Sequence, residues 1–509
     1  MDGSFLLNGE AAGVDRRTFL RQSALVAAGT AGLTVGPFGG LVWRAAFAEP
    51  KLARENGGYG PLRDDVPDLR DGVVRLHVPT GFQYRSFGLV GTPLTEDGAI
   101  TPGRHDGMAA FTWRNGRVRL IRNHETTQPG VTGAFGDSSK AYDTRAPGGT
   151  TTLEITPHAD EVRSWASLNG TTFNCAGGET PWGTWITCEE TPNGVDQQRS
   201  FLVGPNDPDD LSYEQKHGYL FEVPASRGPG ELEVGEPITQ AGRFAHEAAA
   251  VDPSSGVVYM TEDDFAYASG FFRYIPPNNP FRDKRVADGG RLQVLGVIPA
   301  GATGPVAIDL HTGQTPGSTY RVAWIDIDDP DPDFGPGLSN DEAARIVFQE
   351  GESKGAARFA RNEGMAYWAG KIFFVSTEGG GPFVSDPPPN SSAGVGDGYG
   401  QVWMYDTKAE TLTLVFESPG PDVLDFPDNI VISPRRKSVL MCEDSSSGNM
   451  LRALTTDGHL FDFALNAISG GADEFAGATF GPGGHVLYTN MQSNGLTYAI
   501  WGPWQRGLL

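Results

Sequence analysis

The segment FNCAGGETPWGTWITCEE, residues 173–190, contains the pattern that decides the fold. A polar start at Asn174-Cys175 leads into a short strand, Pro181 and Gly183 turn the chain, and a second, apolar strand runs directly into Glu189-Glu190. The pattern begins again in five further places, at His105, Phe244, Phe359, Phe426 and Glu474. Most copies continue into a third strand of aromatic character. Repeated units of about four strands are typical of propeller blades, so we predict an all-β, six-bladed β-propeller with inserted loops between blades.

The spacing of the copies predicts one insertion. Glu262 and Glu378 are 116 residues apart, whereas Glu378 and Glu443 are only 65 apart. We place an insertion at roughly 277–357, within a single propeller domain at 49–509. The acidic loop 326–333 in this insertion begins like an EF-hand loop, but Phe334 stands where that loop requires Gly. We expect a solvated loop there, with an accessory calcium site as the alternative.

The repeat places polar residues at one end of every unit. The first strand of a propeller blade lines the central channel, so its start and the end of the second strand lie on the same face. Apolar strands run into carboxylates at this position five times, at Glu125, Glu190, Glu262, Glu378 and Glu443. Turns rich in Asp and Asn would explain one or two acids per blade, but not this recurrence. We therefore expect many carboxylates to converge on the channel mouth.

Converging carboxylates repel one another unless they are protonated, paired or bound to metal. Bound cations account for so many acids most simply, and oxygen ligands suit hard ions such as Ca²⁺ or Fe³⁺. Cys175 is the exception in this set, because a thiolate among carboxylates points to a transition metal. The alternative is that Cys175 is a small buried residue with no ligand role.

The composition narrows the classes of function. The chain has 509 residues with 63 acidic and 39 basic side chains, a formal net charge of −24. A nucleic-acid-binding surface needs clustered positive charge, so this class is disfavoured. The three cysteines, Cys175, Cys188 and Cys442, form no CxxC motif, so a disulfide framework is not expected.

Residues 1–48 have the pattern of a twin-arginine export signal. Arg16-Arg17 is followed by a weakly hydrophobic stretch rich in Ala and Gly, and Ala46-Phe47-Ala48 is a cleavage motif. Gly residues and Pro37 interrupt the apolar stretch, so we expect no permanent membrane anchor. We expect export by the twin-arginine translocase to a periplasmic, cell-wall-associated or extracellular location, and a monomeric protein.

Several of these motifs resemble those of the PhoX-type alkaline phosphatases. The long segment 174–190 is the most specific, and the resemblance covers about residues 60–505. Shorter motifs agree with it: Asn123-His124-Glu125, Gly242-Arg-Phe-Ala-His246-Glu247, Arg358-Phe-Ala-Arg361-Asn362-Glu363, Cys442-Glu443-Asp444 and Glu474-Phe475-Ala476-Gly477.

This resemblance implies hydrolysis of phosphate monoesters by a mixed iron–calcium cluster at the channel mouth. Its iron ligands would be Cys175, Glu190, Glu247 and Glu363. Its calcium ligands would be Asn123, Glu125, Glu262, Glu443 and Asp444. The choices between Glu189 and Glu190 and between Glu247 and Glu262 stay open. Arg361 would bind the substrate phosphate, and its alternative role is to pair with a rim carboxylate such as Glu363.

Two other functions fit part of the pattern. A calcium-dependent propeller lactonase or esterase needs the rim acids but neither Cys175 nor Arg361. A non-catalytic propeller that binds a protein or polymer partner would need calcium only as a structural staple. His124 and His246 adjoin rim carboxylates, and we expect them to orient ligands through hydrogen bonds rather than to bind metal.

Overall fold

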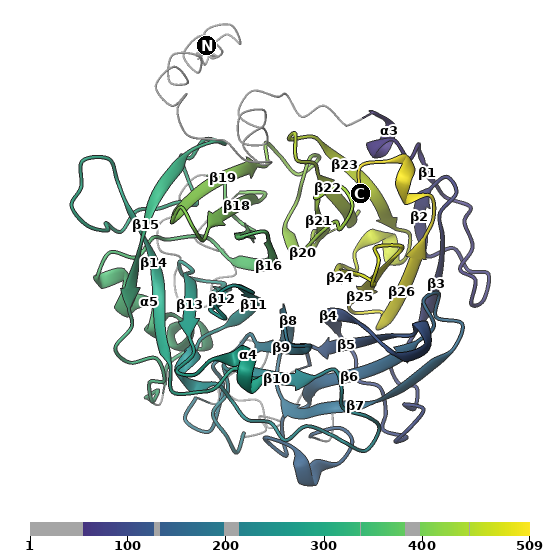
Figure 1. Ribbon diagram of the computed structural model, residues 1–509, viewed down its shortest axis with the longest axis horizontal. Coiled ribbons are helices and arrows are strands. Elements are labelled where there is room, and N and C mark those ends of the chain that lie inside the picture. Colours follow the sequence, from purple (N-terminus) through teal and green to yellow (C-terminus); the bar gives the residue numbers. More distant parts are fainter. Residues whose placement is uncertain (1–53, 127–132, 198–212, 336, 382–397, 447) are drawn as a thin grey trace, which may run out of the picture.

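The computed structural model describes residues 54–126, 133–197, 213–335, 337–381, 398–446 and 448–509. The export signal expected at 1–48 lies outside the described residues. The fold is all-β and propeller-like, with its sheets arranged around a central axis (Figure 1). The prediction of an all-β propeller is confirmed at this level. No helix in the described ranges is long and apolar enough to cross a membrane.

The strands follow one another as six antiparallel units, listed here in chain order. They are β4 (His105–Thr112), β5 (Val118–His124), β6 (Gly148–Ile155) and β7 (Val162–Thr171); β8 (Asn174–Glu179), β9 (Thr184–Glu189) and β10 (Leu220–Pro224); β11 (His246–Val251), β12 (Val258–Glu262), β13 (Phe271–Ile275) and β14 (Arg291–Ile298); β16 (Asn362–Trp368), β17 (Lys371–Ser376), β18 (Gln401–Asp406) and β19 (Thr411–Glu417); β20 (Pro427–Ile432), β21 (Val439–Glu443), β22 (Met450–Leu454) and β23 (Leu460–Asn466); and β24 (Phe475–Phe480), β25 (Val486–Met491) and β26 (Leu496–Trp501).

Hydrogen bonding joins these units into five sheets in the described part of the chain, rather than the expected six. The reason lies in the insertion, where β15 (Thr319–Asp326) pairs with both β14 and β19. Two neighbouring units thereby become one nine-stranded sheet. The innermost strands still form a closed ring, since each of β4, β8, β11, β16, β20 and β24 contacts the next and β24 contacts β4.

The insertion adds strand β15 and the helices α4 (Pro280–Asp283) and α5 (Asn340–Ser353), and Figure 1 shows β15 and α5 on the outside of the ring. Its acidic loop is held by basic and hydroxyl groups. Lys216 forms an ion pair with Asp333 at 2.5 Å, and the Tyr219 hydroxyl donates to Asp331 at 2.7 Å. Lys354 pairs with Asp328 at 2.8 Å. The loop therefore has its own counter-charges.

The two ends of the described chain close the ring together. Strand β3 (Gln83–Phe87) pairs with β26, while β2 (Leu76–Pro79) pairs with β23 and with the two-residue β1 (Leu62–Arg63). Helix α3 (Arg54–Gly57) packs near β23. The Tyr59 hydroxyl donates to the carbonyl of Trp504 at 3.0 Å and accepts from the amide of Leu509 at 3.0 Å. Residues from both ends of the sequence thus share one apolar core.

Candidate metal centre

Each innermost strand carries an irregularity at the same place. His246 lies opposite Glu262 and Ala249 lies opposite Met260, so three steps along β11 match two along β12. The same one-residue shift occurs near the start of β4, β8, β16, β20 and β24. A β-bulge of this kind bends a strand and changes where a side chain points. The repeat therefore places one bulge in every unit at the same level of the channel.

The residue at the start of the bulge is an acid or a thiol in five of the six units. These residues, which we call the rim set, are Asp106, Cys175, Glu247, Glu363 and Asp428. The sixth unit has Gly477 at this position, with φ of +58°. A side chain there would collide with the carbonyl oxygen of Asp106 and strain the backbone, so a glycine is required.

The residue just before the innermost strand is strained in four units. Arg104, Phe173, Arg361 and Phe426 have φ of +45°, +49°, +50° and +47°. Non-glycine residues rarely adopt this left-handed conformation, and such strain concentrates at functional sites. The same strained backbone conformation therefore precedes the innermost strand in four of the six units.

The rim set joins other acids in three buried groups. Within each group, potential ligand atoms lie within 4.8 Å of one another. The groups are Cys175, Glu190 and Glu247; Glu247, Glu363 and Asp428; and Asp106, Glu125 and Glu474. Glu247 belongs to the first two, which together form a continuous set of five side chains. All four residues expected to bind iron, Cys175, Glu190, Glu247 and Glu363, lie in this set.

The electrostatics of these groups favour bound cations. Burial, followed by repulsion from Glu247 and Asp263, raises the pKa of Glu190 well above its usual range. Burial and the neighbouring carboxylates likewise raise the pKa of Glu247, Glu363 and Asp428. Burial raises the pKa of the Cys175 thiol, and Glu247 and Glu190 add to that effect. A cation at the centre would remove these penalties, because it favours the charged form of each ligand.

The third group, Asp106, Glu125 and Glu474, offers only oxygen ligands, and we call it the oxygen-only group. The pKa values of its acids are also raised. Burial is the main reason that the pKa of Asp106 rises to about 6 and that of Glu125 to about 8. One oxygen of Asp106, Oδ1, is buried and has no hydrogen-bond partner among the residues that the structure describes. Oxygen-only donors suit Ca²⁺, whereas the thiol of the first group suits a transition metal. The residues therefore fit both kinds of ion that the sequence led us to expect.

Four of the five expected calcium ligands lie outside these groups of the described residues: Asn123, Glu262, Glu443 and Asp444. The Asn123 side-chain amide donates to the carbonyls of Cys175 and Ala176 at 2.8 and 2.7 Å, and its oxygen accepts from the Trp185 indole at 2.8 Å. Glu262 accepts from the Gly270 amide at 2.7 Å. Glu443 accepts from the amides of Asp425 and Met450, at 3.0 and 3.2 Å.

The alternation of strand side chains explains these positions. Glu262 and Glu443 lie directly opposite His246 and Pro427, and their side chains turn into the sheet. The next residues along, Asp263 and Asp444, correspond to Glu125 and Glu190 in their units. Asp444 influences the ionisation of Glu474 and Asp428, so it lies beside the rim as expected.

The sequence analysis did not select four acids that the structure brings to the mouth: Asp106, Asp428, Glu474 and Asp263. The signal was present, because Asp106 and Asp428 occupy the same place in the repeat as Glu247 and Glu363. Aligning the six copies of the sequence pattern residue by residue would have selected Asp106 and Asp428.

Arg361 lies among these acids. Its Nε and Nη2 donate to the two oxygens of Asp263 at 3.1 and 2.8 Å, and Nη2 also donates to Glu363 at 2.7 Å. Its guanidinium stacks over the ring of Phe265 at 4.4 Å. In this structure Arg361 therefore has the rim-pairing role, at a position that also faces the channel mouth.

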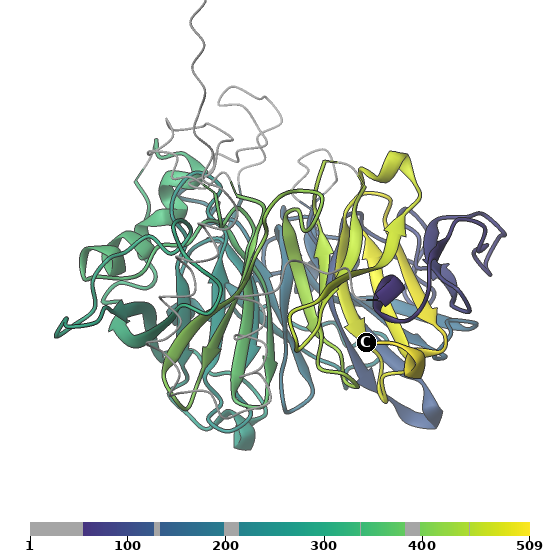
Figure 2. The ribbon, with the colours of Figure 1, turned by 90° about the horizontal axis from the view of Figure 1, so that it is seen from above.

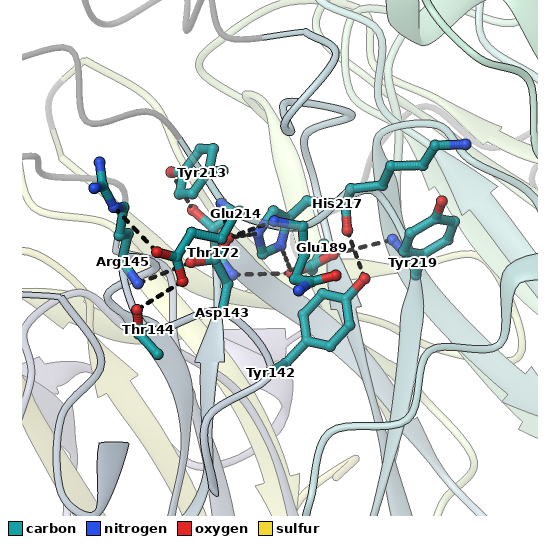
Figure 3. A network of polar contacts seen from close by, with 12 residues as sticks. Tyr142, Asp143, Thr144, Arg145, Thr172, Glu189, Tyr213, Glu214, His217 and Tyr219 are labelled. Atoms are coloured by element: carbon teal, nitrogen blue, oxygen red, sulfur yellow. Dashed lines mark hydrogen bonds and ion pairs between the residues drawn. The ribbon is translucent and has the colours of Figure 1, made fainter. Parts of the chain in front are cut away.

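Glu189 and Glu190 have separate environments, which Figure 3 shows for Glu189. Glu189 accepts from His217 Nδ1 at 2.6 Å and from the amides of Thr172, Gly218 and Tyr219 at 2.9 to 3.2 Å. His217 Nε2 lies 3.4 Å from Asp143. These hydrogen bonds hold the Glu189 carboxylate within the sheet, whereas Glu190 lies in the group with Cys175.

His124 and His246, the two histidines expected to orient ligands, make hydrogen bonds to other parts of the chain. His124 contacts the Gly103 carbonyl at 3.0 Å and the Thr151 hydroxyl at 2.9 Å, and His246 contacts the Gly242 carbonyl at 2.9 Å. Neither belongs to the three metal-type groups in the described residues. Both hold the turns that lead into the innermost strands.

An axial cavity of about 410 Å³ begins directly below the rim. Small residues that follow the rim set in the chain line it, including Gly107, Ala176, Ala248 and Gly364. The view from above, in Figure 2, shows the strands running steeply through the thickness of the ring. The acids therefore close one end of a channel with narrow, mostly apolar walls.

Fold and site together define a propeller-like protein with a buried carboxylate–thiol centre at its channel mouth. A family model described as alkaline phosphatase PhoX matches residues 57–163 and 157–495, most of the chain. The chain belongs to this family. No curated protein sequence matches it at the threshold applied.

One solved structure supports the fold. Pseudomonas fluorescens PhoX in complex with vanadate, a transition-state analogue, is 18% identical, with 86% of this chain and 97% of that chain covered and a TM-score of 0.59. A gluconolactonase from Xanthomonas campestris is 13% identical, with 87% and 98% covered, but its TM-score is only 0.35. Trypanosoma rangeli sialidase is 7% identical, with 83% and 60% covered and a TM-score of 0.38.

Proposed function

We propose that this protein is a metal-dependent phosphatase that hydrolyses phosphate monoesters at the mouth of a six-bladed propeller. One observation carries the proposal: a chain of the PhoX alkaline phosphatase family gathers Cys175, Glu190, Glu247, Glu363 and Asp428 into one buried group. The closed ring of six innermost strands supports the blade count, with β15 acting as a bridge between two blades.

We assign the thiol-containing group to iron and the oxygen-only group to calcium. Cys175, Glu190, Glu247 and Glu363 would hold iron, with Asp428 as a further ligand. Glu125 would hold calcium together with Asp106 and Glu474, and Asp444 lies close enough to complete that site. Asn123, Glu262 and Glu443 would support the centre through the backbone that they bind.

The charge of the site explains why cations are needed. A phosphate dianion is repelled by a mouth lined with acids, and bound cations would reverse that field and activate a water for attack on phosphorus. The carboxylates fix the positions of those charges, because each is held on a bulge of a rigid strand. Arg361 would offer its planar fork to the phosphoryl oxygens as charge develops.

The test is hydrolysis of 4-nitrophenyl phosphate by the metal-loaded protein. We expect turnover that chelator abolishes and that added iron and calcium restore. Arg361→Lys keeps the charge but loses the fork, so kcat/KM should fall on the order of 10²-fold while the metal content stays unchanged. Hydrolysis of 4-nitrophenyl acetate without hydrolysis of the phosphate would instead support the lactonase or esterase alternative.

We further propose export by the twin-arginine translocase, cleavage after Ala48 and a monomeric mature protein without a permanent membrane anchor. The sequence of residues 1–48 supports this proposal. Replacing Arg16 and Arg17 by Lys should leave the protein in the cytoplasmic fraction. An unchanged distribution between cell fractions would contradict it.

A further inference from the structure

Two arginines occupy the same position on opposite sides of the ring. Arg104 directly precedes β4 and Arg361 directly precedes β16, and both have a left-handed backbone. Around the ring of innermost strands, β4 and β16 are three steps apart in either direction. Figure 1 shows the two strands facing one another across the centre. The two guanidinium groups are therefore presented to the channel mouth from opposite walls.

The guanidinium groups of Arg361 and Arg104 differ in their exposure and in the number of acids that they pair with. Arg361 is only 12% exposed, with Asp263 and Glu363 accepting from it and Glu378 3.8 Å away. The Arg104 side chain is 43% exposed, and its Nε and Nη2 both donate to a single oxygen, Glu125 Oε2, at 3.0 and 2.8 Å. Among the described residues, Nη1 of Arg104 has no hydrogen-bond partner. In the part of the chain that the structure describes, the guanidinium edge that carries Nη1 therefore has no partner, and the side chain is partly exposed at the mouth.

The hydrogen bonds from Nε and Nη2 of Arg104 to Glu125 fix the orientation of the guanidinium group, and with it the edge that carries Nη1. Glu125 Oε2 also accepts from Gln492 at 2.6 Å, and Gln492 in turn donates to Asp106 at 2.9 Å. The acid that anchors Arg104 thus belongs to the oxygen-only group. Cations bound in that group would offset its negative charge, so the free edge would present a net positive field to the mouth.

We propose that Arg104 is a second anion-binding residue, which makes the site selective for phosphate esters whose alcohol part carries a second anionic group. The inference rests on the proposed function, in which Arg361 and the bound cations take the reacting phosphoryl group. The free edge of Arg104 then binds a carboxylate or second phosphate on the same substrate. An arginine can hold Glu125 with one edge and an anion with the other, whereas a lysine offers no second edge.

The test is calorimetric titration of the metal-loaded protein with benzylphosphonate, which has one anionic group, and with 4-carboxybenzylphosphonate, which has two. Wild type should bind the second ligand more tightly. In Arg104→Gln the affinity for 4-carboxybenzylphosphonate should fall about ten-fold or more, as for loss of a charge-assisted hydrogen bond, while benzylphosphonate should change by less than about three-fold. Arg104→Lys should behave like Arg104→Gln.

Arg114→Gln is the matched control, because it removes the same charge from an exposed position beyond the other end of β4. It should bind both ligands as wild type does. Equal weakening of both ligands by Arg104→Gln, a loss of calcium in that variant, no change at all, or full recovery in Arg104→Lys would each overturn the proposal. Failure of the proposed function is distinct from these results, since it would appear in wild type as an absence of 4-nitrophenyl phosphate turnover.

Discussion

Two adjacent carboxylates, Glu189 and Glu190, have different chemical roles because a strand alternates its side chains. Glu189 points into the sheet, where three backbone amides and His217 satisfy it. Glu190 points to the channel, where it meets Cys175 and Glu247. A fully buried Asp143–His217–Glu189 chain therefore fixes the end of the strand that delivers Glu190.

The pH dependence of stability should show whether His217 is positively charged in the folded protein. Burial alone would lower its pKa, but Glu189 and Asp143 raise it to about 9. A raised histidine pKa stabilises the fold fully below the unfolded value near 6.5, and this contribution is lost as the pH rises through about 9. The melting temperature of His217→Gln should thus lie well below wild type at pH 6 and approach it above pH 9. A gap that does not change with pH would contradict the charged state of His217.

Cys175 should be required for the metal centre and not for the fold. Cys175→Ala removes the only sulfur ligand of its group, so iron and any visible sulfur-to-metal absorption should be lost. Cys188→Ala and Cys442→Ala are matched controls, since both thiols are buried and lie outside the three groups. Circular dichroism should be unchanged in all three variants. Full iron content in Cys175→Ala would show that the sulfur is no ligand.

The motifs of the sequence predicted some of the residues at the channel mouth but not the direction of every side chain. The motifs predicted that Cys175, Glu190, Glu247 and Glu363 come together, and the structure places them in joined groups. The side chains of Glu262 and Glu443 turn into the sheet, so their calcium role stays a prediction, while the next residues, Asp263 and Asp444, face the channel. Only the pairing register shows which of two consecutive acids faces the channel, because a shift of one residue reverses the direction of a side chain.

The bulged innermost strand is the element that builds the site. Six strands repeat the same departure from regular pairing, and five of them use it to aim an acid or a thiol at the channel. The repeat pattern in the sequence predicted the strands. The bulge itself leaves no local signature except small residues after the rim set, such as Gly107, Ala176 and Gly364.

Gly477 should be sensitive to substitution, because it combines a left-handed backbone with a close backbone neighbour. Gly477→Ala adds a methyl group that collides with the Asp106 carbonyl in a left-handed backbone, so we expect a loss of roughly 2 kcal/mol or more and weaker calcium binding. Gly116→Ala is the matched control. Its φ of +72° is also left-handed, but nothing lies within 4 Å of the added carbon. Equal effects of the two changes, measured by urea unfolding and calcium titration, would show that strain alone matters.

The innermost strands close into a ring, and the acids at its channel mouth repel one another. Strand β3 completes the last sheet from the N-terminal side, and Tyr59 binds residues near the C-terminus. The sequence predicted six units but not the strand β15, which joins two of them into one sheet. An edge-to-edge pairing between an insertion and a distant strand depends on tertiary contacts that no local pattern encodes.

Chelation should weaken the whole ring. A metal bound only to the native state stabilises it by mass action, and its removal leaves the buried acids without their counter-charge. We expect chelator to lower the melting temperature by several degrees and added Ca²⁺ to restore it. The same treatment of a variant with Glu125, Glu474 and Asp106 replaced by their amides should have a much smaller effect. A wild-type melting temperature indifferent to chelator would contradict the calcium assignment.

The most direct test of the central claim is anomalous X-ray scattering from crystals of the purified protein at the iron edge. We expect an iron peak bounded by Cys175, Glu190 and Glu247, and non-iron cation density among Asp106, Glu125 and Glu474. No iron peak at Cys175, or iron located only at the oxygen-only group, would contradict it.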